Sequence, residues 1–154
     1  MRLTLAAVGR LRAGPEKALV DDYLARFAKA GRPLGLPPVD LSEVDARGAG
    51  TAAEADLLRR AAPKGALLCV LDERGERLSS PDLAARLAGW RDGARDVAFL
   101  IGGADGLDPG LRAEAGFALS FGAMVWPHAL ARAMLAEQLY RAASILAGSP
   151  YHRA

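Results

Sequence analysis

Short runs of apolar residues alternate along this chain with longer stretches in which apolar residues recur every three or four positions. Runs of the first kind predict strands buried in a sheet, and spacing of the second kind predicts amphipathic helices. The predicted strands cover residues 3–8, 39–44, 66–71, 97–101 and 118–120. The predicted helices cover 15–30, a segment beginning at Thr51, a segment from Ser80 to Trp90, a short segment after Asp108-Pro109, and 129–147.

The alternation of strands and helices predicts an α/β fold with a three-layer parallel sheet. Parallel neighbours need a crossover between them, and strands covered on both faces read as continuous apolar runs. No linker or internal repeat interrupts the pattern, so we expect a single domain over residues 1–154. Ligands of open parallel sheets bind beyond the carboxyl ends of the strands. This rule selects Leu71-Asp72, Gly102-Gly103 and the segment after Ser120.

Polar residues and glycines mark the expected ends of several helices. Thr51 is predicted to cap the second helix, with Glu54 completing a capping box. Ser80 is predicted to cap the next long helix, because Pro81 suits its first position. Gly148 is expected to close the last helix.

The composition describes a protein with little excess charge. The chain has 154 residues, a formal net charge of +2 and a sequence pI near 9.0. Such a chain does not bind nucleic acid by net charge alone, so any RNA contact must be local. Cys69 lies in an apolar run and is expected to be an inert core thiol. No apolar run approaches the roughly 20 residues of a membrane span, so we expect a cytoplasmic protein, and we expect no metal site.

A glycine-rich corner, Gly102-Gly103-Ala104-Asp105-Gly106, directly follows the predicted strand 97–101. It contains neither Gly-x-Gly-x-x-Gly nor the Gly-Lys-Ser/Thr of a P-loop, so a phosphate cradle is not expected. One interpretation is a tight turn that uses the conformational freedom of glycine. The other is a close approach of the backbone to a ligand, which the position at a strand end favours.

His128 follows Pro127 at the start of the last predicted helix. The helix dipole there favours a neutral imidazole that can accept a proton. A histidine at a helix start is also often a cap or a surface residue, and the residues themselves leave both interpretations open.

The last helix is apolar around most of its circumference, which predicts packing on its own sheet and against a second subunit. Glu137 and Arg141 lie four positions apart on it, as in a surface ion pair. The tail Tyr151-His152-Arg153 is expected to be disordered, as chain ends commonly are. Its side chains would nevertheless suit stacking on an exposed base and binding its phosphate.

Several spaced motifs agree in order with one known family. They are Leu5-Ala6-Ala7-Val8-Gly9, Tyr23-x-x-Arg26-Phe27, Leu100-Ile101-Gly102-Gly103, Gly106-Leu107, Pro127-His128, Arg132, Leu135-Ala136-Glu137-Gln138-Leu139-Tyr140-Arg141-Ala142, Ile145 and Pro150-Tyr151-His152. With these motifs the whole chain resembles the RlmH family, bacterial pseudouridine methyltransferases of 23S rRNA that belong to the SPOUT class. The resemblance implies S-adenosylmethionine as cofactor, N3 of a pseudouridine on the assembled ribosome as target, a C-terminal trefoil knot and a homodimer.

The resemblance also assigns roles to individual residues. The implied cofactor pocket comprises Leu71, Gly103, Phe121, Gly122, Ala123, Met124, Val125, Trp126 and Pro127. Gly122 and Val125 stand where the family commonly has a serine and a threonine, so we expect backbone groups to recognise the adenine. His128 or His152 is expected to orient or deprotonate the base, and the residues do not decide between them. The remaining implied contacts are Arg132 and Arg153 on RNA phosphate, Tyr151 stacked on a base, and Arg141.

An alternative interpretation is a non-catalytic α/β module that binds the ribosome or a nucleotide. A flavodoxin-like protein is disfavoured because the first strand ends in Ala7-Val8-Gly9-Arg10, without an acidic cluster or a phosphate loop. The two main interpretations differ in one simple property: a catalyst must bind S-adenosylmethionine, whereas a scaffold need not.

Overall fold

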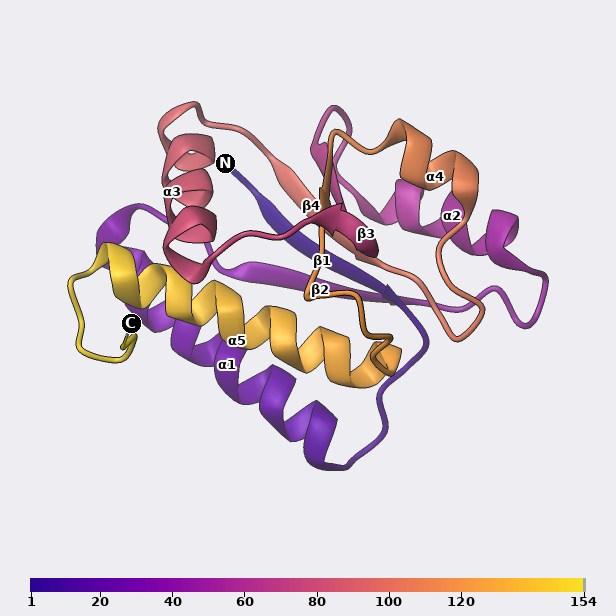
Figure 1. The fold of residues 1–154 in the computed structure, drawn as a ribbon, viewed down its shortest axis with the longest axis horizontal. Coiled ribbons are helices and arrows are strands. Elements are labelled where there is room, and N and C mark those ends of the chain that lie inside the picture. Colours follow the sequence, from indigo (N-terminus) through magenta and orange to yellow (C-terminus); the bar gives the residue numbers. More distant parts are fainter. Residues whose placement is uncertain (154) are drawn as a thin grey trace.

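The fold of residues 1–153 is described by a computed structural model (Figure 1). Five strands alternate with five α-helices, as the apolar pattern predicts. In chain order the elements are β1 (Leu3–Val8), α1 (Pro15–Gly31), a 3-10 helix (Arg32–Leu34), β2 (Val39–Val44), α2 (Thr51–Ala61), β3 (Leu67–Glu76), α3 (Ser80–Asp92), β4 (Val97–Ile101), α4 (Pro109–Glu114), β5 (Phe117–Leu119) and α5 (His128–Leu146).

The strands form one parallel sheet in the order β2-β1-β4-β3-β5. Helices α1, α3 and α5 pack on one face, and α2 and α4 pack on the other. Figure 1 shows α1 and α5 side by side along the sheet, with α2 and α4 together beyond it. The three-layer α/β architecture is therefore confirmed. The trefoil knot implied by the resemblance stays a prediction.

The central strands β1 and β4 supply both hydrophobic layers. Leu5 and Phe99 point toward α1, α3 and α5, whereas Ala6 and Leu100 point toward α2 and α4, and all four are fully buried. Side chains of a strand alternate between its two faces, so a continuous apolar run serves both layers at once. Cys69 is also fully buried, and this burial raises the pKa of its thiol.

Strand β3 continues to Glu76, beyond its predicted end at Leu71. The extra residues are mostly charged, so the apolar pattern of the sequence does not predict this part of the strand. Gly75 allows this extension, because a Cβ at that position would lie 2.5 Å from the carbonyl oxygen of Ala118 in β5. The register of the β3 and β5 pairing shifts between Leu71 and Glu76, which places a bulge beside the candidate site.

Two predicted helix caps are wrong. Helix α2 is capped by Gly50 and has no side-chain cap, while Thr51 is its first residue. Helix α3 is capped by Ser79 rather than Ser80: the Ser79 hydroxyl accepts from the Asp82 N–H at 3.1 Å, and the Asp82 carboxylate accepts from the Ser79 N–H at 3.2 Å. Adjacent serines give the same local pattern, and the carboxylate three residues on selects the first.

None of the helices within residues 1–153 combines the length and apolar character needed to cross a membrane.

Candidate functional site

A cavity of about 590 Å³ lies at the carboxyl ends of β3, β4 and β5. Its walls come from the three segments that the parallel-sheet rule selects, of which Leu71-Asp72 lies within β3, together with the first turn of α5. Of the nine residues expected to bind a cofactor, eight line this cavity: Leu71, Gly103, Phe121, Gly122, Met124, Val125, Trp126 and Pro127. Ala123 does not line it.

The glycine corner after β4 is packed too tightly for side chains. A Cβ on Gly102 would lie 2.8 Å from the carbonyl oxygen of Gly106. Gly106 has φ 83°, a left-handed value that favours glycine, and its N–H donates to the carbonyl of Gly103 at 3.0 Å. The corner therefore folds back on itself and presents bare backbone to the cavity, which confirms the tight turn and places it against the candidate site.

Ser120 fixes the start of the loop that follows β5, and sequence reasoning did not assign it a role. Its buried hydroxyl donates to the carbonyl of Glu73 at 3.0 Å and accepts from the N–H of Gly122 at 3.0 Å. These bonds tie the loop over residues 121–127 to the end of β3. The loop carries three large exposed apolar side chains, Met124 at 74%, Val125 at 79% and Trp126 at 40% exposure, so most of its surface is free to contact a ligand or partner.

One wall of the cavity is charged. Asp72, at only 5% side-chain exposure, forms ion pairs with Arg112 from α4 and with Arg74. Burial tends to raise the pKa of Asp72, but the hydrogen bond from the Arg74 N–H and the charge of Arg112 outweigh burial and lower it. Asp72 is thus an anion fixed at the wall, where it can accept hydrogen bonds.

His128 begins α5 and lines the cavity. Its Nε2 would lie 3.8 Å from a Cβ placed on Gly9, so the imidazole packs against the end of β1. On the other side of the sheet, Glu54 approaches the glycine corner, with Oε2 3.3 Å from a Cβ position on Gly103. Burial, Asp105 and Asp45 raise the pKa of Glu54, while His128 lowers it. Within residues 1–153 the buried Oε1 of Glu54 has no hydrogen-bond partner.

Arg132 does not face the cavity or the solvent, which contradicts its expected contact with RNA phosphate. Its side chain is fully buried. The guanidinium forms an ion pair with Glu43 at 2.7 Å and donates to the carbonyls of Val8 and Gly9 at 3.2 and 3.0 Å. Burial lowers the pKa of Arg132 and Glu43 opposes this effect. The residue ties α5 to the ends of β1 and β2, one turn after His128.

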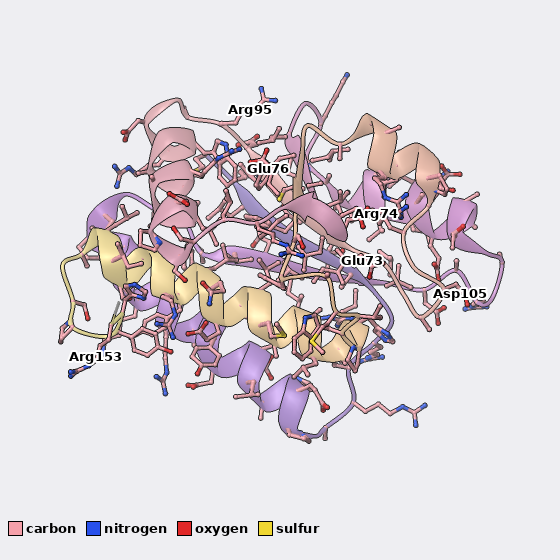
Figure 2. The ribbon with its side chains drawn as sticks, viewed as in Figure 1. Glu73, Arg74, Glu76, Arg95, Asp105 and Arg153 are labelled. Carbon is pink, nitrogen blue, oxygen red and sulfur yellow. The ribbon has the colours of Figure 1, made fainter. Side chains whose placement is uncertain are left out.

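Tyr151 and His152 of the C-terminal tail are held against α5, which contradicts the expected disorder. The Tyr151 hydroxyl donates to Glu137 at 2.9 Å, and its ring meets Tyr140 edge-on at 4.7 Å. Burial, Tyr23 and Glu137 raise the pKa of Tyr151. The tail thus folds back on α5, far from the cavity: Figure 2 shows Asp105, in the glycine corner, and Arg153 at opposite ends of the molecule.

The ion pair between Glu137 and Arg141 is better shielded from solvent than a surface pair, because the two side chains are only 18% and 24% exposed. It lies near a second hollow of about 650 Å³, formed between α1, α5 and the start of α3. Apolar side chains dominate its lining, among them Leu19, Leu130 and Met134. This hollow exposes the part of α5 that does not pack on its own sheet.

Among residues 1–153, no three His, Cys, Asp or Glu side chains are grouped so that they can hold a metal ion.

The family model described as predicted SPOUT methyltransferase matches residues 1–152. A parallel sheet with a ligand-sized cavity at its carboxyl edge, together with this match, defines a methyltransferase of the SPOUT class. Among solved structures, a probable methylase family protein from Haemophilus influenzae aligns with a TM-score of 0.53 at 11% identity, over 99% of this chain and 70% of that one. This likeness concerns the fold alone.

Two relatives narrow the assignment. The chain is 71% identical over 154 residues to the Ribosomal RNA large subunit methyltransferase H of Paracoccus denitrificans, and 68% identical over 155 residues to the protein of the same name in Ruegeria pomeroyi. Each alignment covers 99% of both chains. The chain belongs to this methyltransferase H family, which confirms the resemblance carried by its motifs.

Proposed function

We propose that this protein methylates large-subunit ribosomal RNA with S-adenosylmethionine as methyl donor, at N3 of a pseudouridine in 23S rRNA. The observation that carries the proposal is the cavity, because its lining matches eight of the nine residues expected to bind the cofactor. The names of the relatives support the ribosomal RNA target. An RNA bound within the ribosome is consistent with the small net charge of +2, since the ribosome itself supplies much of the recognition surface.

The cavity suits S-adenosylmethionine in size and chemistry. Its volume of about 590 Å³ falls within the usual range for small-ligand pockets, roughly 300–1,000 Å³. Leu71 and Phe121 would hold the apolar parts of the cofactor, and the bare backbone at Gly103 would hold its polar edges. When bound, the cofactor supplies an electrophilic methyl group.

The protein must supply a proton acceptor and a frame for the substrate base. N3 of a uracil ring carries a proton that must leave before its lone pair can attack. His128 is the candidate acceptor because it lines the cavity, and general base catalysis contributes roughly 10²- to 10⁴-fold in rate. Buried Arg132 supports His128 indirectly, because it donates to the carbonyl of Gly9 and the imidazole of His128 packs against Gly9.

We further propose a homodimer in which the tail of one copy reaches the cavity of the other. His128 and Arg141 are separated by about 20 Å along α5, at about 1.5 Å per residue, and the tail is held at the Arg141 end. A chain therefore cannot bring both histidines to its own cavity. The apolar hollow beside α5 offers a surface for the second copy, and exposed Leu19 on its rim suits such a contact.

Two measurements test the proposed function. Mass spectrometry of 23S rRNA from a deletion strain should show the loss of one methyl group on a pseudouridine, restored by the wild-type gene. Single-turnover methylation by His128→Ala should be about 100-fold slower or worse than wild type. An unchanged rRNA spectrum would exclude the target, and a wild-type protein that does not bind S-adenosylmethionine would favour a non-catalytic module.

The homodimer has a separate test. Light scattering coupled to size-exclusion chromatography should give twice the chain mass for the wild type and the single-chain mass for Leu19→Glu. A monomeric wild-type protein that still methylates its substrate would contradict the shared site.

Action on the ribosome also implies that the protein works in the cytoplasm.

A further inference from the structure

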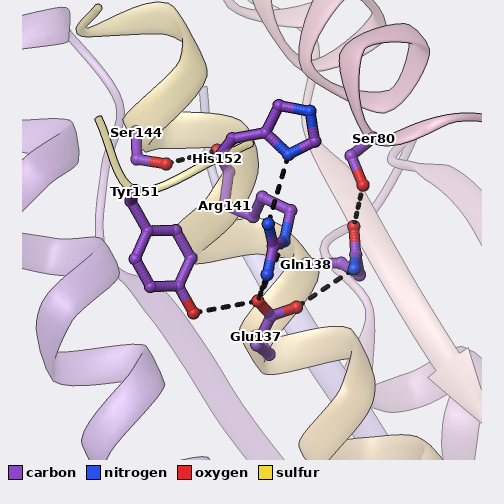
Figure 3. A network of polar contacts seen from close by, with 7 residues as sticks. All are labelled: Ser80, Glu137, Gln138, Arg141, Ser144, Tyr151 and His152. Carbon is purple, nitrogen blue, oxygen red and sulfur yellow. Dashed lines mark hydrogen bonds and ion pairs between the residues drawn. The ribbon is translucent and has the colours of Figure 1, made fainter. Parts of the chain in front are cut away.

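The tail is held by a compact polar network centred on Glu137 (Figure 3). The Glu137 carboxylate accepts from Arg141 at 2.6 Å, from the Tyr151 hydroxyl at 2.9 Å and from Gln138 at 3.0 Å. Arg141 also covers the Tyr151 ring, with its guanidinium carbon 4.9 Å from the ring centroid. Gln138 is in turn held by the Ser80 hydroxyl at 2.7 Å, so the network extends from α5 to α3.

His152 is the last member of this network. Its Nδ1 lies 3.2 Å from the Nη1 of Arg141, and both side chains are half-buried (Figure 3). A guanidinium group has hydrogens to donate and no lone pair to accept. The Nδ1 of His152 must therefore be the acceptor in this contact, which means that it carries no proton.

An imidazole without a proton on Nδ1 is neutral and carries its single proton on Nε2. Three features keep the imidazole in this state. Arg141 supplies the donor, Glu137 fixes the position of Arg141, and the docked Tyr151 ring fixes the adjacent backbone. The Nε2–H of His152 is thus a hydrogen-bond donor, and its Nδ1 lone pair is already occupied.

We propose that His152 acts on the substrate base as a hydrogen-bond donor through Nε2–H, not as a base, and that Arg141 and Glu137 are the positioning residues that fix this state. The proposal rests on the proposed function and on the shared site of the dimer. Removing the N3 proton of a uracil ring places negative charge on its two carbonyl oxygens. A fixed donor beside one of them stabilises that charge, as in an oxyanion hole.

The proton balance follows from this division of roles. The N3 proton moves to His128, the bond between the sulfonium sulfur and the methyl carbon breaks, and the new bond forms between that carbon and N3. His152 keeps its proton on Nε2 throughout, so it is unchanged at the end of the reaction.

Glutamine distinguishes a donor from a base at position 152. Its amide nitrogen can take the place of Nε2 and donate, but an amide does not accept a proton at neutral pH. In single-turnover methylation, His152→Gln should stay within about tenfold of wild type, whereas His152→Ala should be about 100-fold slower or worse, as when one oxyanion donor is removed. His128→Gln is the matched control and should be as slow as His128→Ala. If His152→Gln were as slow as His152→Ala, the donor role would be wrong.

Nitrogen NMR tests the same proposal without activity. The chain has two histidines, so the His128→Gln protein carries one imidazole and its signals need no further assignment. At neutral pH the spectrum should show one tautomer, with the proton on Nε2, and Arg141→Ala should convert it to a mixture. A proton on Nδ1, or a mixture before the substitution, would overturn the proposal. If the wild-type protein neither bound S-adenosylmethionine nor methylated rRNA, the proposed function would fail while the NMR result stood.

Discussion

Gly102→Ala perturbs the proposed cofactor site with a single added carbon. That Cβ would meet three backbone atoms: the carbonyl oxygen of Gly106 at 2.8 Å, its carbonyl carbon at 3.0 Å and the Cα of Leu107 at 3.3 Å. Ordinary contact begins at 3.4 Å, so the backbone at Gly106 must move by about 0.6 Å. Because both sides of the clash are backbone, no side chain can rotate away to relieve it.

The displaced segment is part of the cavity wall, so binding should suffer directly. A shift of this size is expected to weaken S-adenosylmethionine binding about 10- to 100-fold, by analogy with the cost of misplacing reacting groups by about 1 Å. Overpacking of this kind also costs about 1–3 kcal/mol of stability. Calorimetric titration with S-adenosylmethionine and thermal melting measure the two effects separately.

Gly89→Ala is the matched control. Gly89 lies inside α3, and a Cβ there meets nothing within 4 Å. Alanine should stabilise this helix by about 0.5–1 kcal/mol and leave the affinity for S-adenosylmethionine unchanged. A Gly102→Ala protein that bound the cofactor as tightly as Gly89→Ala would refute the account of the glycine corner.

Three further substitutions test other parts of the structure. Arg132→Met leaves Glu43 without its buried partner and should cost about 3–5 kcal/mol in urea unfolding, whereas a loss below about 1 kcal/mol would mean that the pair contributes little. Glu54→Gln should raise the melting temperature at pH 8 but not at pH 4. The raised pKa of Glu54 means that its carboxyl holds its proton more tightly in the folded state than in the unfolded state. The folded protein therefore loses stability as the pH rises from about 4.5, the ordinary pKa of the carboxyl, through its pKa in the folded state. Equal shifts at both pH values would contradict this reasoning. Ser79→Ala should lower the melting temperature by about 2–4 °C through loss of its cap, worth about 1 kcal/mol, while Ser80→Ala should not remove that cap.

The sheet and the position of the candidate cavity could be predicted from the apolar runs and from where they end. Continuous apolar runs such as 97–101 admit few interpretations other than a strand covered on both faces. The rule that ligands bind at carboxyl ends then selects the segments that line the cavity. The added residues of β3 were missed because they are charged, and their pairing depends on Gly75 lying against β5, a contact between distant parts of the chain.

The roles of polar residues were harder to predict, because they depend on which partner folding brings near. Arg132 looked available for RNA, but Glu43, from β2, and the carbonyls at the end of β1 hold it inside the protein. The tail looked free, but Glu137 and the ring of Tyr140 hold Tyr151 against α5. Neither contact follows from a regular spacing of residues along the sequence, so the sequence could not predict either of them. Ser120 was missed for the same reason, since both groups that it bonds are backbone groups, one in β3 and one in the loop after β5.

The central claim is that the cavity at the carboxyl ends of β3, β4 and β5 receives the methyl donor. A crystal structure of the wild-type protein grown with S-adenosylmethionine tests this most directly. The account predicts density for the whole cofactor between Leu71, Gly103 and the loop ending at Pro127, in contact with backbone groups of the glycine corner. Cofactor density at any other place on the chain, with this cavity filled by water alone, would contradict it.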